Sequence, residues 1–214
     1  MQKHRFAWGT FVAFGILHLT ALYWDLELLR RLSKLVLIPL LLLVYISSSN
    51  AKPKKAIVLA LIFSFLGDAL LLGTSSTFFL SGIAAFLVTQ LLYSYALVKS
   101  SGIHPLGVLL GTIVFGTYAG VFLYFLFPTL GDFTAAISIY ALAICSFGIL
   151  AFQKFYGQPR SAIGLLLGAT LFILSDSMIA INQFYVNYNY FTIEIMATYI
   201  VAQGLIIGYF INNS

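Results

Sequence analysis

Two aspartates lie deep inside long apolar stretches of this 214-residue chain, and they are its first indication of chemistry. Asp68 lies within residues 61–73, and Asp176 lies within residues 165–181. An ionisable group in hydrocarbon costs on the order of a few kcal/mol, so such a residue usually has a task or a partner. Two carboxyl groups in similar settings predict a pair that carries out acid/base chemistry or carries protons. The alternative is that each carboxyl only joins helices by accepting hydrogen bonds from nearby serine hydroxyls.

The composition identifies the environment in which these carboxyl groups must work. The chain is 61% hydrophobic and only 8% charged, with a mean hydropathy of +1.02. A water-soluble domain of this size cannot bury that much apolar surface, so we predict an all-α integral membrane protein. The net charge of +5 comes from basic residues in short loops, which is not the footprint of a nucleic-acid-binding protein. The single cysteine, Cys145, excludes an internal disulfide.

Apolar runs of bilayer-spanning length predict about eight transmembrane helices in a single domain over residues 1–214. The runs are separated by short segments rich in Gly, Pro, Asn or charge, which predicts antiparallel neighbours. The expected helices are 6–23, 28–47, 55–74, 77–98, 104–127, 133–155, 161–183 and 190–211.

The distribution of basic residues predicts that both termini lie in the cytoplasm. With this orientation eight basic residues are cytoplasmic and three are outside, as the positive-inside rule requires. The cytoplasmic residues are Lys3, Arg5, Lys52, Lys54, Lys55, Lys99, Lys154 and Arg160. The outer residues are Arg30, Arg31 and Lys34.

Helix counting predicts that the two aspartates lie at one depth. Asp68 is roughly 20 Å and Asp176 roughly 22 Å from the cytoplasmic start of its helix, at 1.5 Å per residue. In a hydrocarbon core of about 30 Å both positions fall in the outer half. Lys34 enters from the outside and comes within about two turns of the same level. Its spacing alone favours an interpretation in which the ammonium group extends to the outer interface.

Four further polar side chains are expected at membrane depth on the last helix of two hairpins. They are Gln90, Tyr93, Tyr199 and Gln203. Within each pair the two residues share a helix face, and each hairpin carries one of the aspartates on its first helix. The resemblance between the hairpins suggests a parallel 4+4 internal repeat. Hydrogen bonding between helices and substrate binding are equally good interpretations of the four residues.

Motifs of soluble enzymes and metal sites are missing from the sequence. There is no Walker loop, dinucleotide fingerprint or His-Glu-x-x-His motif. His18 and His104 are isolated from other potential ligands, so we expect no metal site.

Several motifs occur together in a fixed order along the chain. They are Lys34 with Pro39-Leu40-Leu41-Leu42, Ser64-Phe65-Leu66-Gly67-Asp68, Ala85-Phe86 through Gln90-Leu91-Leu92-Tyr93, Gly168 through Ser175-Asp176-Ser177 with Asn182 and Phe184, and Tyr199 with Ala202-Gln203. In these motifs the chain resembles the lysoplasmalogenase (YhhN-like) family of polytopic membrane proteins over nearly its whole length. One departure is that Lys34 precedes Leu35, where the family often has a proline.

The resemblance implies hydrolysis of the vinyl-ether bond of lysoplasmalogens, which yields a fatty aldehyde and a glycerophospho-alcohol. This chemistry needs one carboxylic acid to protonate the β-carbon and one carboxylate to activate water or offset the oxocarbenium ion, much as in glycoside hydrolysis. Asp68 and Asp176 are the expected catalytic pair, with their individual roles left open. The substrate-binding residues would be Lys34, Gln90, Tyr93, Tyr199 and Gln203. Neither a metal nor an organic cofactor is required.

The expected partner is therefore a lysophospholipid in the bilayer, and the expected location is a bacterial cytoplasmic membrane. A different class of protein fits the same residues. Membrane aspartates and a parallel repeat are also typical of a proton-coupled transporter of small molecules or lipids. An enzyme would release aldehyde in detergent, whereas a transporter needs a sealed membrane and a gradient.

Overall fold

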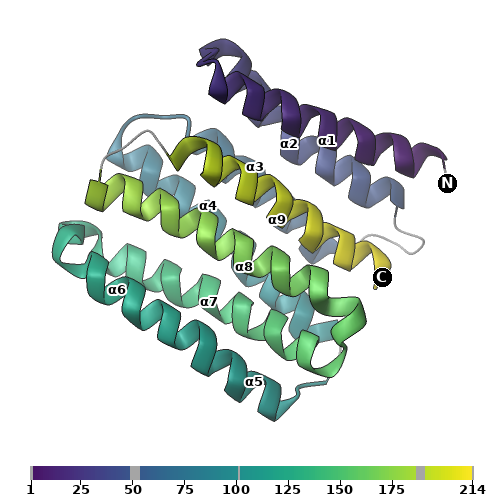
Figure 1. Ribbon diagram of the computed structural model, residues 1–214, viewed down its shortest axis with the longest axis vertical. Helices are drawn as coiled ribbons and strands as arrows, with labels where there is room; N and C mark the ends of the chain where they lie inside the picture. Colours follow the sequence, from purple (N-terminus) through teal and green to yellow (C-terminus); the bar gives the residue numbers. More distant parts are fainter. Residues whose placement is uncertain (1, 49–53, 101, 187–190, 214) are drawn as a thin grey trace.

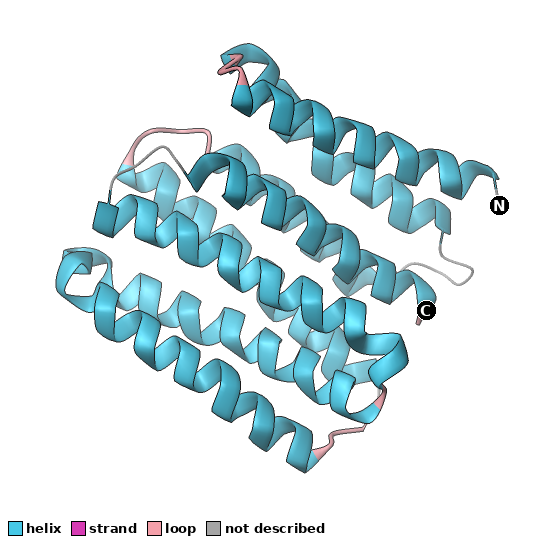
Figure 2. Ribbon diagram, in the orientation of Figure 1, coloured by secondary structure: helices cyan, strands magenta, loops and turns pink. Residues whose placement is uncertain are grey.

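A computed structural model describes residues 2–48, 54–100, 102–186 and 191–213, and all regular structure in these ranges is helical (Figures 1 and 2). Two π-helical turns, η1 and η3, and one 3₁₀ turn, η2, interrupt or extend the α-helices. The elements are α1 (Gln2–Tyr23), α2 (Glu27–Ser48), α3 (Lys55–Leu70), α4 (Ser76–Ser100), α5 (Pro105–Gly111), η1 (Thr112–Gly116), α6 (Thr117–Leu130), η2 (Gly131–Phe133), α7 (Thr134–Gly157), α8 (Pro159–Ile181), η3 (Asn182–Val186) and α9 (Thr192–Asn212).

The helices form a bundle of long, roughly aligned rods (Figure 1). Sequential hairpins pack together as α1 on α2, α3 on α4 and α8 on α9. Contacts between hairpins bring α4 against α7 and α9 against both α1 and α2. The pair of α1 and α2 lies at one side of the bundle, and α5, η1 and α6 form a continuous rod at the other (Figure 1).

Within the described residues, five helical segments are long and apolar enough to cross a membrane: Phe6–Tyr23, Ser76–Ser100, Pro105–Gly157, Pro159–Val186 and Thr192–Asn212. The third segment folds back on itself at η2, where Gly131 has a φ of +51°. The backbone of Gly107 approaches Gln153, and that of Gly111 approaches Ile149, so α5 runs antiparallel to α7. Pro105–Gly157 is therefore a helical hairpin.

The expected helix positions agree with the structure to within a few residues, with two corrections. The helix expected over 55–74 ends at Leu70, because the chain turns at 71–75 in order to enter α4. The helix expected to stop before Pro128 continues to Leu130, because a proline near a helix end removes only one hydrogen bond. The predicted orientation stays a prediction, and Lys52, one of the residues on which it rests, lies outside the described residues.

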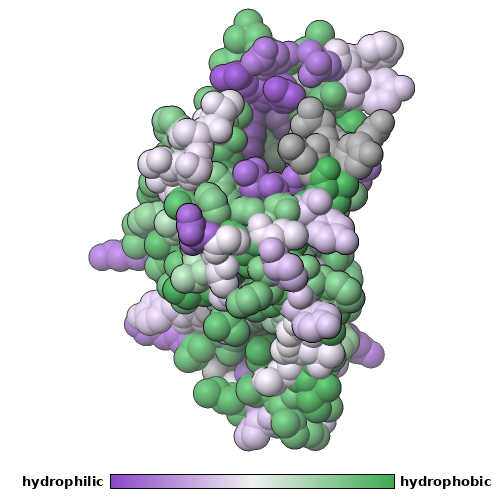
Figure 3. Space-filling model, turned by 90° about the vertical axis from the view of Figure 1, so that its left-hand side faces the viewer, coloured by the Kyte–Doolittle hydropathy of each residue, from purple (hydrophilic) through white to green (hydrophobic). Residues whose placement is uncertain are grey.

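The surface of the bundle is largely apolar, as a lipid environment requires. Many large hydrophobic side chains are exposed, among them Phe6, Leu28, Tyr124 and Phe125. On the face in Figure 3, hydrophilic side chains gather toward the end at which α1 joins α2, and much of the remaining surface is hydrophobic. Such a distribution is typical of a protein whose solvent is hydrocarbon.

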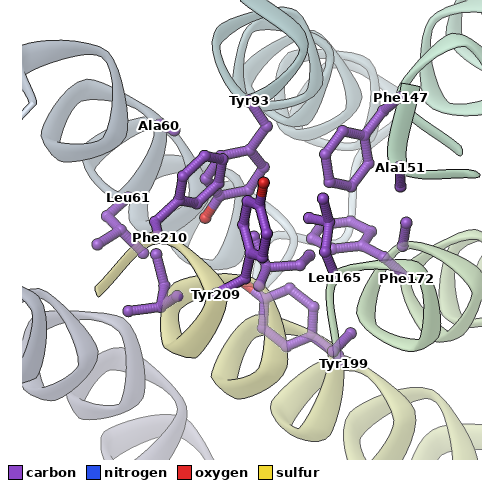
Figure 4. Packing of buried hydrophobic residues seen from close by; sticks show 14 of the residues in the cluster. Ala60, Leu61, Tyr93, Phe147, Ala151, Leu165, Phe172, Tyr199, Tyr209 and Phe210 are labelled. Carbon is purple, nitrogen blue, oxygen red and sulfur yellow. The ribbon is translucent and has the colours of Figure 1, made fainter. Parts of the chain in front are cut away.

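Aromatic rings fill the interior between α4, α8 and α9. The rings of Phe86, Phe172 and Tyr199 make edge contacts with centroids 5.5–6.1 Å apart. Tyr93 stacks on Phe210, and Figure 4 shows this pair together with Phe172 and Tyr199. A Cβ atom at Gly67 would lie 2.6 Å from the Phe86 ring, so only glycine at this position lets Phe86 pack against α3 one residue before Asp68.

Close packing of α8 on α9 depends on Gly168, which predicts the effect of one substitution. A Cβ atom at Gly168 would lie 2.9 Å from Ile206 and 3.0 Å from the Ala202 carbonyl oxygen, whereas Gly164, one turn earlier, has open space. We expect Gly168→Val to lower the free energy of unfolding by about 1–3 kcal/mol. Thermal unfolding in detergent measures the effect, with Gly164→Val as the matched control. Equal melting temperatures for the two variants would contradict this packing.

Candidate active site

Asp68 lies in the interior with two partners from distant parts of the chain. Lys34 Nζ lies 3.6 Å from Asp68 Oδ1, with side chains 14% and 4% exposed. The Tyr199 hydroxyl donates a hydrogen bond of 2.8 Å to Asp68 Oδ2. The interpretation in which Lys34 extends to the outer interface is therefore wrong, because its ammonium group turns inward to an opposite charge. These contacts join α2, α3 and α9.

A hydrogen-bond network extends from Asp68 through the residues expected on α4 and α9. Tyr93 donates to Gln203 Oε1 at 2.8 Å, and Gln203 Nε2 donates to Ser64 Oγ at 3.0 Å. Gln203 Nε2 also lies 3.4 Å from the Tyr199 hydroxyl oxygen. All of these side chains are buried. Tyr93 and Gln203 thus bond between helices and hold Tyr199 in position.

Asp176 occupies a different setting, on the wall of a small apolar cavity of about 40 Å³ between α4, α6, α7 and α8. Its Oδ2 atom accepts a hydrogen bond from the Tyr140 hydroxyl. Beside it, the Tyr118 hydroxyl donates to Ser177 Oγ at 2.7 Å. No basic side chain lines this cavity among the described residues. Asp176 therefore faces an apolar space with hydroxyl groups as its polar neighbours.

The two aspartates are neighbours but not direct partners. They lie close enough for their charges to interact, and no hydrogen bond joins them among the described residues. Phe86 connects their surroundings, because its ring lines the cavity of Asp176 and packs on Tyr199, which bonds to Asp68. Ser64 and Ser175, the hydroxyls considered as partners of the aspartates, bond instead to other helices.

Gln90 is the expected site residue whose polar atoms remain unpaired. It is fully buried on α4 and lies near the Tyr140 hydroxyl. Neither its amide oxygen nor its amide nitrogen forms a hydrogen bond of normal geometry with a described residue. A buried amide without a partner is rare and indicates a place for water or a ligand. Gln90 therefore marks a polar position beside the Tyr140–Asp176 pair.

Sequence reasoning missed Tyr140 and Tyr118. Each is one tyrosine in a long apolar run, and no local pattern distinguishes it from the tyrosines that face lipid. The isolated histidines differ from each other: His18 is buried with Nδ1 2.8 Å from Ser33 Oγ, whereas His104 is exposed. Within the described ranges, no three His, Cys, Asp or Glu side chains gather closely enough to hold a metal ion.

The fold and the site define a polytopic helical membrane protein with two interior carboxyl groups on neighbouring polar clusters. The chain belongs to the YhhN family, whose model matches residues 29–209 and so includes every site residue described above. It is 34% identical over 158 residues to proteins named lysoplasmalogenase TMEM86A from Bos taurus and from Homo sapiens. It is 37% identical over 150 residues to lysoplasmalogenase TMEM86B from Sus scrofa.

These matches cover most of this chain but a smaller part of the relatives. They include 70% of this chain and 62% of each TMEM86A protein, and 69% of this chain and 59% of TMEM86B. The chain therefore spans about three fifths of the length of these relatives. No solved structure matches the chain.

The burial of Lys34 and Asp68 predicts a strong and specific effect on stability. We expect Lys34→Met to lower the free energy of unfolding by about 3–5 kcal/mol, because it leaves the Asp68 carboxylate without its cation. The double variant Lys34→Met/Asp68→Asn removes both charges and should regain most of the loss. Thermal unfolding in detergent measures both effects, and Lys55→Met on an exposed lysine is the control. A Lys34→Met variant as stable as this control would contradict the ion pair.

Proposed function

We propose that this protein is a membrane-embedded hydrolase that cleaves the vinyl-ether bond of lysoplasmalogens. The observation that carries the proposal is the placement of Asp176 on an apolar cavity, beside a second carboxyl group held by a lysine. The apolar lining of the cavity suits the root of a lipid chain, where the vinyl-ether bond lies, and two carboxyl groups in different environments suit acid/base chemistry. The names of the relatives support the same substrate class.

Asp176 is the residue we assign as the general acid. Its hydrogen bond from Tyr140 fixes the carboxyl group at the cavity wall, and apolar surroundings favour the neutral form of a carboxyl. In the proposed reaction its proton moves to the β-carbon of the vinyl ether, and the electrons of the double bond form the new C–H bond. The product of this step is an oxocarbenium ion, and Asp176 becomes a carboxylate.

Asp68 supplies the stable negative charge. An adjacent ammonium group stabilises a carboxylate, and Tyr199 fixes its second oxygen. Water then adds to the carbon of the oxocarbenium ion and loses a proton to a carboxylate, which gives a hemiacetal. Cleavage of the hemiacetal releases the fatty aldehyde and the glycerophospho-alcohol, so that one water is consumed for each bond broken.

The remaining polar residues take roles that follow from their contacts. Lys34 stabilises the negative charge of Asp68, because its ammonium group already forms an ion pair with that carboxylate. Gln90 has free amide atoms and would hold the attacking water or the glycerol oxygen. Tyr199 positions Asp68 through its hydroxyl group, and Tyr93 and Gln203 keep Tyr199 in place.

We further propose that the chain is a single transmembrane domain of eight spans in a bacterial cytoplasmic membrane, with both termini on the cytoplasmic side. Helices α2 and α3 complete the eight spans, because the five long apolar segments contain six helical rods once the hairpin Pro105–Gly157 is counted as two. They are not among those segments because α2 carries four charged residues and α3 is only 16 residues long. The parallel repeat is supported by equivalent contacts. In one half Lys34 on α2 contacts Asp68 on α3, and in the other Tyr140 on α7 contacts Asp176 on α8.

Removing either carboxyl group tests the hydrolase. We expect Asp68→Asn and Asp176→Asn each to slow aldehyde release from lysoplasmenylethanolamine by about 10²- to 10⁴-fold, the range of general acid–base catalysis. Purified protein in detergent is used, because a transporter would release no aldehyde under these conditions. Asp132→Asn, on an exposed carboxyl in η2, should keep wild-type activity. Full activity in both folded site variants would rule out the proposed pair.

Tyr140 gives a milder test of the same assignment. Tyr140→Phe keeps the ring but removes the hydroxyl that holds Asp176. As the Asp176 proton leaves, the Tyr140 hydroxyl stabilises the negative charge that develops on the carboxyl group. Because a hydrogen bond to a charged group contributes about 1.5–3 kcal/mol, we expect kcat to fall about 10- to 100-fold with the folded state preserved. Tyr124→Phe, on a ring exposed at the surface, should leave kcat unchanged. If both variants turned over equally fast, Tyr140 would have no part in positioning the acid.

A further inference from the structure

A second apolar hollow lies beside the cavity of Asp176. It is a groove of about 440 Å³ on the outside of the bundle, between α6 and the segment in which α8 passes into η3. Val121 and Phe125 form one side, and Ile181, Tyr185 and Val186 form the other. Val121, Phe125 and Tyr185 are strongly exposed, at 52%, 66% and 65%. In a bilayer this groove faces the lipid.

Two side chains belong to both the groove and the cavity. Tyr118 and Phe122 line the groove on one side and the cavity on the other. Their rings are parallel to within 7°, with centroids 6.1 Å apart, and the Tyr118 hydroxyl bonds to Ser177 next to Asp176. This stacked pair is therefore the partition between the lipid-facing groove and the space that contains the carboxyl group.

The backbone on both sides of the partition departs from regular α-helix. The π-helical turn η1 ends two residues before Tyr118, and η3 carries Tyr185 and Val186. Single π-helical turns are rare, and they occur frequently at functional sites in helices. Their position on each side of the groove is the second, independent observation that distinguishes it from an ordinary lipid-facing surface.

We propose that this groove is the lateral entrance through which the hydrocarbon chain of a single-chain ether phospholipid enters from the bilayer. The proposal rests on the proposed function and adds the route and the chain-binding subsite. The scissile bond of such a lipid lies at the root of its chain. With that bond at Asp176, the chain must leave along an apolar path, and the continuous surface of Tyr118 and Phe122 provides one. Rotation of Tyr118 away from Ser177 opens the partition.

Photolabelling tests the chain-binding site without depending on hydrolysis. The probe is a non-cleavable alkyl-ether lysophosphatidylcholine with a diazirine near the end of its chain, bound to the wild-type protein in nanodiscs. We expect mass spectrometry to find Val121, Phe125 and Tyr185 labelled about tenfold more than Leu142, an exposed residue outside the groove. Excess unlabelled single-chain ether lipid should remove this preference. Uniform labelling of all lipid-facing positions, or no competition, would overturn the proposal.

A matched pair of substitutions tests the entrance in the catalysed reaction. Val121 on α6 and Leu142 on α7 both face the lipid, at 52% and 61% exposed, but only Val121 lines the groove. We expect Val121→Trp to raise KM for a long-chain lysoplasmalogen about tenfold while kcat changes little, and Leu142→Trp to match wild type. Equal KM values for the two variants would overturn the proposal. A wild-type protein that releases no aldehyde would refute the proposed function, whereas the labelling pattern would still decide the groove.

Discussion

The contact of Asp68 with Lys34 and Tyr199 is the interaction on which the interior of this protein depends. The bilayer core offers no water to an ionised group, so a charge placed there must be satisfied by other parts of the chain. Asp68 obtains its cation from α2 and its hydroxyl from α9, which are far apart in sequence. The position of three helices is thereby coupled to a single carboxyl group. The second layer of bonds, from Tyr93 through Gln203 to Ser64, brings α4 into the same arrangement.

The protein places its two carboxyl groups in environments of different kind, and the proposed acid/base reaction requires this difference. Asp68 is compensated by a full charge, whereas Asp176 has hydroxyl neighbours and an apolar cavity. Enzymes that protonate one atom while stabilising positive charge on another assign the two tasks to groups with opposed surroundings. The Phe86 ring lies between the two centres, because it contacts Tyr199 beside Asp68 and also lines the cavity of Asp176. The lateral entrance that we propose completes this arrangement, because the substrate under the proposed function is a lipid of the bilayer.

Much of the fold could be predicted from the sequence, because hydrophobic length and helix-breaking residues act locally. The expected helices agree closely with α1 through α9, and the errors are local as well. The chain turned early after Leu70, and it continued as a helix past Pro128. The π-helical turns η1 and η3 had no sequence signal, since they depend on how neighbouring helices pack. The same is true of Gly67 and Gly168, whose need for small size depends on the side chain that faces them.

The sequence by itself determined that the chain is a helical membrane protein. It also determined that Asp68 and Asp176 are the ionisable residues placed in hydrocarbon at a cost in free energy. These conclusions need only hydropathy and helical periodicity, which are properties of short segments. Tertiary structure alone decided that Lys34 turns inward, that Tyr140 holds Asp176, and that the amide of Gln90 stays unpaired. The reason is that each of these outcomes depends on how a helix is rotated about its axis and on which helix lies beside it. Neither quantity is encoded in the residues next to the one concerned.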